Sequence, residues 1–256
     1  QIVVDPEKNP FPRLKQAYQQ CLPFIPKEIL EEMRGLADGS GLPLEDVRDA
    51  NMIPELFHCS GFALWGRATK DGVLYHGRIL DYAMEIGYHK YAVLIVARPQ
   101  GKHAFINVGW AGFIGVLSGL NEQAISIGQI GAETTDATFQ GEPMVFLMRR
   151  VLEEAETLED AAALISGARR TVGVNYVIAD ATTRRAVALE TTRPHVRVFE
   201  ANAPAERAVS YARPREDAVF RADTAMDPTI RDAQLASQGN PTRPGLEDPA
   251  GSSAYD

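Results

Sequence analysis

Three neighbouring runs in the first half of the chain, GFALWGRAT, GVLYHGRIL and KYAVLIVARP, are rich in aromatic and β-branched residues. The first two are separated by the tripeptide KDG, and turn residues between two strand-like runs predict an antiparallel hairpin. The runs KHAFINVGW, GFIGVLSGLN and QAISIGQI continue the pattern. A fold for this chain therefore has to accommodate a series of short, consecutive strands.

The residues before these strands have helical rather than strand periodicity. In PKEILEEMRGLADGSG, Ile29, Met33 and Leu36 recur at helical spacing, and the pattern stops at the Gly-Ser-Gly around Ser40. LPLEDVRDANMIPELF is a second helix-like stretch, interrupted at Pro54. The first 58 residues are therefore predicted to be mainly helical.

A pair of helices is predicted after the strands. The first has an apolar face made of Met144, Met148, Val151, Leu152 and Ala155. Thr157, followed three positions later by Asp160, resembles a capping box that opens the second helix. That second helix is predicted to bury Leu158, Ala161, Ile165 and Ala168.

Strand-like runs return at VNYVIADA, RAVALET and HVRVFEA, and after Ala203 the chain becomes polar and rich in proline. We expect this last part to be rich in loops. The order of strands, then a helix pair, then strands predicts an α+β fold, with two antiparallel sheets and helices layered outside them.

Composition excludes several classes of protein. A net charge of −8 argues against a nucleic-acid-binding surface, which depends on clustered lysine and arginine. No run of apolar residues is long enough to predict a membrane span. The five histidines show no zinc-ligand spacing and no GxGxxG motif occurs, so neither a metal nor a dinucleotide cofactor is expected. The chain begins at Gln1 rather than methionine, which favours a secreted or periplasmic protein whose leader has been removed.

Cys59 is one of two cysteines, and a lone cysteine before a strand is usually a small buried core residue. A single bridge between Cys21 and Cys59 is a further alternative. Cys59 stands, however, at the junction between the helical and β-rich segments. The block from Arg78 to Asp81 ends the second strand-like run, so a hairpin would return it towards the first strand. Cys59 is therefore a candidate nucleophile flanked by an arginine and an aspartate.

The segment HCSGFALWGRATKDGVLYHGRILDY resembles the surroundings of the nucleophile in N-terminal nucleophile hydrolases. It is most similar to the isopenicillin-N acyltransferase branch (acyl-CoA:6-aminopenicillanate acyltransferase), with choloylglycine hydrolases, penicillin V acylases and acid ceramidase as more distant relatives. LADGSGLPLEDVRDANMIPEL is similar to the pro-segment of that branch. GVLSGLNEQAISIG resembles its Gly-x-Asn strand, and VNYVIADATTRRAVALE resembles the later strand pair that carries another asparagine.

This resemblance implies a four-layer αββα sandwich. It also implies self-cleavage between His58 and Cys59, which makes Cys59 a new N-terminus. Residues 1–58 would then be a pro-segment that stays bound, and residues 59–256 the catalytic domain, which the loop-rich tail suggests is incomplete at its C-terminus. The implied partner is a small-molecule N-acyl amide, which is hydrolysed or acyl-transferred through a thioester without a cofactor.

The expected chemistry follows from the new N-terminus. A cysteine thiol has a pKa of about 8.5 and an α-amine a pKa of about 7.7–8.0, so the amine of Cys59 can serve as general base for its own thiol. Arg78 should lower the thiol pKa, and Asp81 should accept hydrogen bonds from the α-ammonium group. By resemblance, the backbone N–H of Asn121 and the side-chain amide of Asn175 would stabilise the oxyanion. From the residues alone, Asn121 is a turn asparagine and Asn175 a strand-start residue.

The sequence departs from the family pattern in two places. Ile79 stands where relatives often have asparagine. Relatives also carry a Ser-Ser motif followed shortly by an arginine, whereas here Ser252 and Ser253 are followed by no arginine before Asp256. Two other hypotheses therefore stay open, namely an unprocessed cysteine enzyme with a histidine base and a non-catalytic binding protein on the same scaffold.

Overall fold

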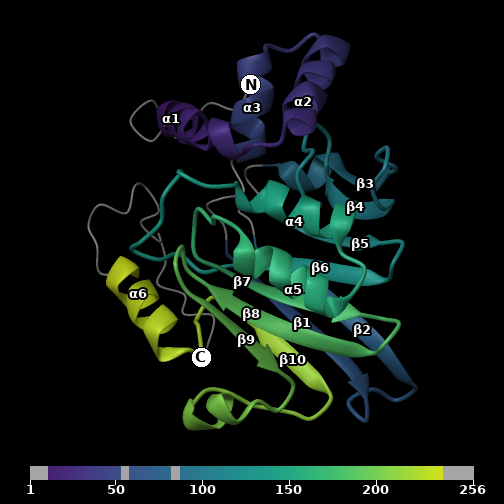
Figure 1. Ribbon diagram of the computed structural model, residues 1–256, viewed down its shortest axis with the longest axis vertical. Coiled ribbons are helices and arrows are strands. Elements are labelled where there is room, and N and C mark those ends of the chain that lie inside the picture. Colours follow the sequence, from purple (N-terminus) through teal and green to yellow (C-terminus); the bar gives the residue numbers. More distant parts are fainter. Residues whose placement is uncertain (1–10, 53–57, 82–86, 239–256) are drawn as a thin grey trace.

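The computed structural model describes residues 11–52, 58–81 and 87–238 (Figure 1). The predicted helical segment is confirmed as α1 (Phe11–Cys21), the 3-10 turn η1 (Leu22–Phe24), α2 (Lys27–Ser40) and α3 (Leu44–Met52). In α2, Ile29, Met33 and Ala37 are buried, and the helix ends where Gly41 adopts a left-handed φ of 70°. No helix in the described ranges is long and apolar enough to cross a lipid bilayer.

The described strands form two antiparallel sheets, as the sequence predicts. The smaller sheet has the order β10-β1-β2 and the larger the order β3-β4-β5-β6-β7-β8-β9. The strands are β1 (His58–Gly66), β2 (Gly72–Asp81), β3 (Ala92–Ala97), β4 (Phe105–Trp110), β5 (Ser118–Asn121), β6 (Ile125–Gly131), β7 (Val174–Asp180), β8 (Arg185–Thr191), β9 (Val196–Glu200) and β10 (Ala218–Arg221). A 3-10 turn, η4 (Tyr88–Tyr91), precedes β3.

The predicted hairpin around KDG is confirmed as β1 and β2. Its turn closes where Asp71 accepts a hydrogen bond from the backbone of Val73 and Gly72 takes a left-handed φ of 70°. The register places Cys59 opposite Leu80. The end of β2 therefore returns to the start of β1, which is what the position of the Arg-x-x-Asp block required.

Two helices, α4 (Met144–Glu154) and α5 (Leu158–Gly167), cover one face of the larger sheet (Figure 1). The capping box is present, because Thr157 Oγ1 accepts from the backbone of Asp160 and the Asp160 carboxylate accepts from the backbone of Thr157. The helix ends at Gly167, one residue before the predicted Ala168. Apolar residues of both helices form one core with β6, β7 and β8, and this core also includes Tyr18 and Met33 from the N-terminal helices.

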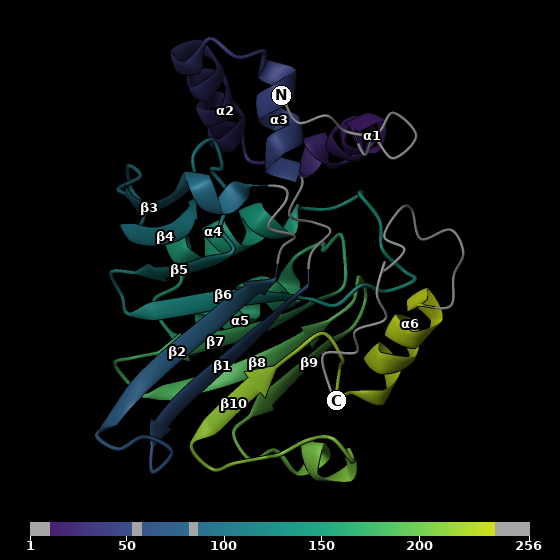
Figure 2. The ribbon, with the colours of Figure 1, turned by 180° about the vertical axis from the view of Figure 1, so that it is seen from behind.

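A second core fills the space between the two sheets. It contains Cys59 and Ala63 from β1, Ile130 from β6, and alternate residues of β7 and β8. Figure 2 shows the smaller sheet from its outer side, and no helix of the described ranges covers it there. Val73, Tyr75 and Ile79 of β2 are exposed. The described chain thus shows three of the four predicted layers.

The stretch after Ala203, which the sequence predicts to be rich in loops, also contains regular structure. After the 3-10 turn η5 (Pro204–Ala208), β10 pairs with β1 in the register Gly61 opposite Arg221. Helix α6 (Pro228–Gln238) then follows. Among the described prolines of this stretch, Pro204 and Pro228 begin η5 and α6, where proline is tolerated, and Pro214 lies between η5 and β10. The pairing matters because it brings the chain after β10 to the start of β1, beside Cys59.

Candidate active site

The candidate site lies at the end of the inter-sheet layer where β1 begins and β2 ends (Figure 2). Cys59 is buried, with 2% of its surface exposed. Its sulfur is surrounded by donors. Arg78 Nη2 lies 2.6 Å from Sγ, and the backbone N–H groups of Asp81 and Gly131 also donate to it. The structure therefore brings Cys59 and Arg78 together, as the sequence predicted.

Arg78 is held in place by Gln129, a residue that the sequence analysis missed. Arg78 Nε donates to the Gln129 backbone oxygen at 2.9 Å, and Arg78 Nη2 donates to Gln129 Oε1 at 2.8 Å. Gln129 Oε1 is also 3.5 Å from Cys59 Sγ. The stem of Arg78 packs on Gly128, where an added Cβ would lie 3.1 Å from Arg78 Cγ. Gln129 and Gly128 thus fix the guanidinium beside the sulfur.

The thiol pKa is raised in this intact chain. Burial is the largest cause, because it disfavours the charged thiolate. The Arg78 charge and the N–H groups of Asp81 and Gly131 act in the expected direction but do not outweigh burial. Cys59 is therefore mainly a neutral thiol before cleavage.

The carboxylate at the Cys59 nitrogen of this intact chain belongs to Asp223. The backbone nitrogen of Cys59 lies 3.3 Å from Asp223 Oδ1. Asp81 contributes its backbone N–H to the sulfur and pairs with His58 across the hairpin. No local motif marks Asp223, because it is distant from Cys59 in the chain and approaches it through the pairing of β10 with β1.

The assignment of Asn121 to the oxyanion site is not supported by the structure. Asn121 ends β5, and its side chain donates to the carbonyls of Leu152 and Ala155 at the end of α4. The preceding residue, Leu120, pairs with Ser126, three residues along β6 from Gln129. At a rise of about 3.3 Å per residue, Asn121 is roughly 10 Å or more from the site. Asn121 is a structural asparagine that holds the β5–β6 turn against α4.

Asn175 lies closer to the site, in the layer between the sheets. It pairs with Ile130, the neighbour of Gly131, and is fully buried. Its Nδ2 donates to the backbone oxygen of Ala222 at 2.9 Å. Its Oδ1 is buried with no hydrogen-bond partner among the described residues. An unpaired buried oxygen costs about 1–3 kcal/mol, so this position is not explained by packing alone.

Other predicted features lie away from Cys59 or outside the described residues. Among histidines with described side chains, none contacts Cys59, and His76 Nδ1 lies 2.7 Å from Ser126 Oγ. Cys21 and Cys59 are both buried and are not joined by a disulfide. His58 is described only as a backbone position of β1, and the Ser252–Ser253 motif lies outside the described residues. No His, Cys, Asp or Glu cluster that could hold a metal ion occurs within the described ranges.

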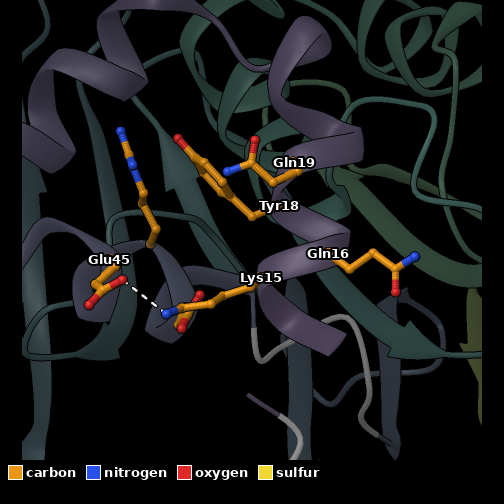
Figure 3. Close-up of a pocket in the computed structure, with 7 residues that line it drawn as sticks. Lys15, Gln16, Tyr18, Gln19 and Glu45 are labelled. Atoms are coloured by element: carbon orange, nitrogen blue, oxygen red, sulfur yellow. Dashed lines mark hydrogen bonds and ion pairs between the residues drawn. The ribbon is translucent and has the colours of Figure 1, made fainter. Parts of the chain in front are cut away.

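A hollow of about 360 Å³ occurs far from this chemistry, among the N-terminal helices (Figure 3). Its lining includes an ion pair of 2.9 Å between Lys15 Nζ and Glu45 Oε2, together with Tyr18 and Asp49. Its lining contains no cysteine, serine or threonine. We therefore take the polar cluster around Cys59, and not this hollow, as the candidate active site.

Fold and site together define a class of protein. Two antiparallel sheets with helices outside, and a cysteine at the start of a strand in the smaller sheet, have the architecture of N-terminal nucleophile hydrolases. The solved N-acylethanolamine-hydrolyzing acid amidase ortholog of Caenorhabditis elegans shares the fold, with a TM-score of 0.51. It is 19% identical, over 64% of this chain and 70% of that chain.

The chain belongs to the acyl-coenzyme A:6-aminopenicillanic acid acyl-transferase family, whose model matches residues 67–210. Two curated proteins are similar to this chain in sequence. Protein dcd1B of Dictyostelium discoideum is 31% identical over an alignment of 186 residues, and the match covers 71% of this chain and 37% of the relative. Acid ceramidase of Rattus norvegicus is 26% identical over an alignment of 200 residues, and the match covers 66% of this chain and 50% of the relative. This chain thus spans half or less of these two relatives. Cys59 precedes the matched span and Asp223 follows it.

Proposed function

We propose that this protein is a cysteine amidohydrolase or acyltransferase that acts on a linear N-acyl amide bond, after self-cleavage between His58 and Cys59. The observation that supports it best is the set of donors around Cys59 Sγ, with Arg78 Nη2 at 2.6 Å and two backbone N–H groups. A cysteine that only fills a core needs no such donors. A thiolate, and the oxyanion formed beside it, needs them.

Self-cleavage would be the first reaction. Cys59 Sγ adds to the carbonyl carbon of His58, and the peptide C–N bond breaks as the thiol proton passes to the Cys59 nitrogen. Water then hydrolyses the resulting thioester. The products are a carboxylate on His58 and a free α-amine on Cys59, with the thiol restored.

Turnover repeats this chemistry on a substrate. The α-amine takes the thiol proton, and the thiolate adds to the amide carbonyl to form a tetrahedral oxyanion. The amide nitrogen then leaves with that proton, and a thioester to the acyl group remains. Water completes hydrolysis of the thioester, whereas an acceptor amine completes acyl transfer.

The surrounding residues would have separate roles in these steps. Arg78 stabilises the thiolate, and Gln129 orients Arg78. The backbone N–H of Gly131, already at the sulfur, is the first candidate for an oxyanion donor and replaces Asn121 in that role. The second candidate is Asn175, whose amide has a second hydrogen beyond the one given to Ala222.

The names of relatives suggest which amides to test. One structural neighbour is an N-acylethanolamine-hydrolyzing amidase, and one curated relative is a ceramidase. A panel of N-acyl lipids, N-acyl amino acids, penicillins and bile-salt conjugates covers these and the implied family substrates.

The test compares wild type with two matched cysteine variants on this panel. We expect amine release from at least one amide, together with an acyl adduct on the fragment that begins at Cys59, and loss of both in Cys59→Ala. Cys21→Ala, which removes the other buried cysteine, should retain turnover. Equal turnover by wild type and Cys59→Ala would rule out the proposed nucleophile. Loss of turnover in a histidine variant with cleavage intact would favour the histidine-base alternative.

A further inference from the structure

Cys59 has a different charged partner at each of its two reactive atoms. Its sulfur is 2.6 Å from Arg78 Nη2, and its nitrogen is 3.3 Å from Asp223 Oδ1. The positive partner comes from β2, and the negative partner from the segment that follows β10. This arrangement matches a cysteine that carries a negative sulfur and a positive nitrogen.

The segment that carries Asp223 is fixed by side chains from neighbouring elements. On one side of Asp223, Asn175 Nδ2 of β7 donates to the Ala222 carbonyl at 2.9 Å. On the other side, Glu190 of β8 accepts the backbone N–H groups of Met226 and Asp227 at 2.8–2.9 Å. These contacts satisfy buried backbone groups and hold the loop on the sheet.

Two further contacts lie between these anchors, both at Ala225. Its backbone N–H donates to Gln234 Oε1 of α6 at 2.7 Å, and its carbonyl accepts from Tyr211 Oη at 2.6 Å. Four side chains thus fix a segment of irregular backbone that has no strand or helix of its own. Such fixation is what a loop needs if it is to hold a carboxylate against a single atom.

The anchor Glu190 belongs to a buried chain of charges. Arg221 Nε lies 2.7 Å from Glu190 Oε1, and Arg221 Nη2 lies 2.7 Å from Glu206 Oε1. All three side chains are at most 6% exposed. Because Arg221 ends β10, it fixes the start of the same segment from the other direction. Removing one member would leave a buried charge uncompensated, so the chain of charges is a structural support.

We propose that Asp223 holds the nitrogen of Cys59, first as the peptide N–H and, after cleavage, as the α-ammonium group, in the role that family resemblance would give to Asp81. This inference rests on the proposed function, because the α-ammonium group exists only after cleavage. In the cleavage step, the nitrogen gains the proton that the thiol loses, and Asp223 accepts a hydrogen bond from it throughout. The carboxylate then keeps the new N-terminus beside the sulfur.

A carboxylate at this position has a defined effect on titration. It favours the charged ammonium form and disfavours the thiolate, so it moves both deprotonations to higher pH. The elements around the site carry the following charged and titratable residues: His76, Arg78 and Asp81 on β2, Glu190 on β8, Arg221 on β10, and Asp223 and Asp227 on the segment after it. Gln129 of β6 and Asn175 of β7 are uncharged. Glu190 is paired with Arg221, which Glu206 also contacts, and Arg78 and Asp223 are the charges in contact with Cys59.

The test measures the alkylation rate of Cys59 by iodoacetamide against pH in cleaved wild type, Asp223→Asn and Asp81→Asn. Asp223→Asn keeps the shape and removes the charge. We expect its alkylation midpoint to move to lower pH by about one unit, and the acidic limb of kcat/KM to move the same way. Asp81→Asn should leave the alkylation midpoint within a few tenths of a unit. A shift in Asp81→Asn with none in Asp223→Asn would return the role to Asp81.

Two controls keep this test decisive. Asp223→Asn could stay folded by circular dichroism and yet remain uncleaved. In that case Asp223→Glu, which restores the charge, should recover cleavage. An Asp223→Glu variant that is also uncleaved would overturn the inference. Wild type that never exposes Cys59 as an N-terminus would refute the proposed function and this inference together. Wild type that cleaves, with an unshifted Asp223→Asn midpoint, would refute the inference alone.

Discussion

At the scale of single residues, Cys59 is the proposed nucleophile, and its environment in the intact chain opposes ionisation. Burial raises the thiol pKa more than Arg78 lowers it. Cleavage would add a positive α-ammonium group within a few ångströms of the sulfur, and a nearby positive charge favours the thiolate. We therefore expect the thiol to be less reactive in the intact chain than in the cleaved protein.

Asn175→Ala tests the second oxyanion donor. A donor bonds the oxyanion more strongly than the ground-state carbonyl, so its loss should lower kcat by about 10²–10³ and change KM only a few-fold. Alkylation by iodoacetamide builds no oxyanion and should stay near normal. The measurement is steady-state kinetics on a hydrolysed amide, with alkylation and thermal unfolding in parallel. A near-wild-type kcat in Asn175→Ala would show that Asn175 is not an oxyanion donor. A joint fall of stability, alkylation rate and turnover would show that its role is structural, through the hydrogen bond to the Ala222 carbonyl.

At the scale of elements, the contact between β2 and β6 places a neutral histidine between the sheets. His76 Nδ1 bonds Ser126 Oγ, and its Nε2 is buried without a partner among the described residues. Burial lowers the His76 pKa from 6.5 to about 4. The imidazole therefore stays neutral at physiological pH, and the layer below the site carries no charge from this residue.

The lowered pKa of His76 makes stability depend on pH. In the unfolded chain His76 binds a proton below pH 6.5, whereas in the folded chain it does so only below about pH 4. Stability is therefore complete above pH 6.5 and is lost as pH falls towards 4, by at most about 3 kcal/mol because the residue keeps some exposure. His76→Asn can still bond Ser126 but has no group that titrates. Its free energy of unfolding should therefore fall less than that of wild type between pH 7 and pH 4.5. Urea unfolding of both proteins at pH 7 and pH 4.5 measures it, and parallel losses of stability would contradict the assignment.

The elements also show what sequence reasoning could reach. Periodicity located α2, α4, α5 and most strands because each has a long apolar pattern of its own. It missed β10, because four residues in a proline-rich stretch form a strand only through pairing with β1. The residues of the candidate site also fall into those that local sequence predicts and those that it does not. Cys59 and Arg78 share one hairpin and were found, whereas Gln129 and Asp223 come from distant elements and carry no local motif.

At the scale of the whole molecule, the N-terminal helices are part of the folded body and not a loose extension. Arg149 Nη2 of α4 lies 2.7 Å from Glu32 Oε2 of α2. Asn51 of α3 donates to the Gly112 carbonyl at 3.0 Å and accepts from the Ile114 backbone at 2.9 Å. Together with the shared core, these contacts predict that the segment before Cys59 stays bound after cleavage.

Intact mass spectrometry of the expressed chain tests the central claim, that Cys59 becomes an N-terminal nucleophile by self-cleavage. Under denaturing conditions, wild type and Cys21→Ala should each give two fragments, one ending at His58 and one starting at Cys59, and under native conditions one complex of both. Cys59→Ala should give a single chain. A single wild-type chain, or cleavage at the same bond in Cys59→Ala, would contradict the account.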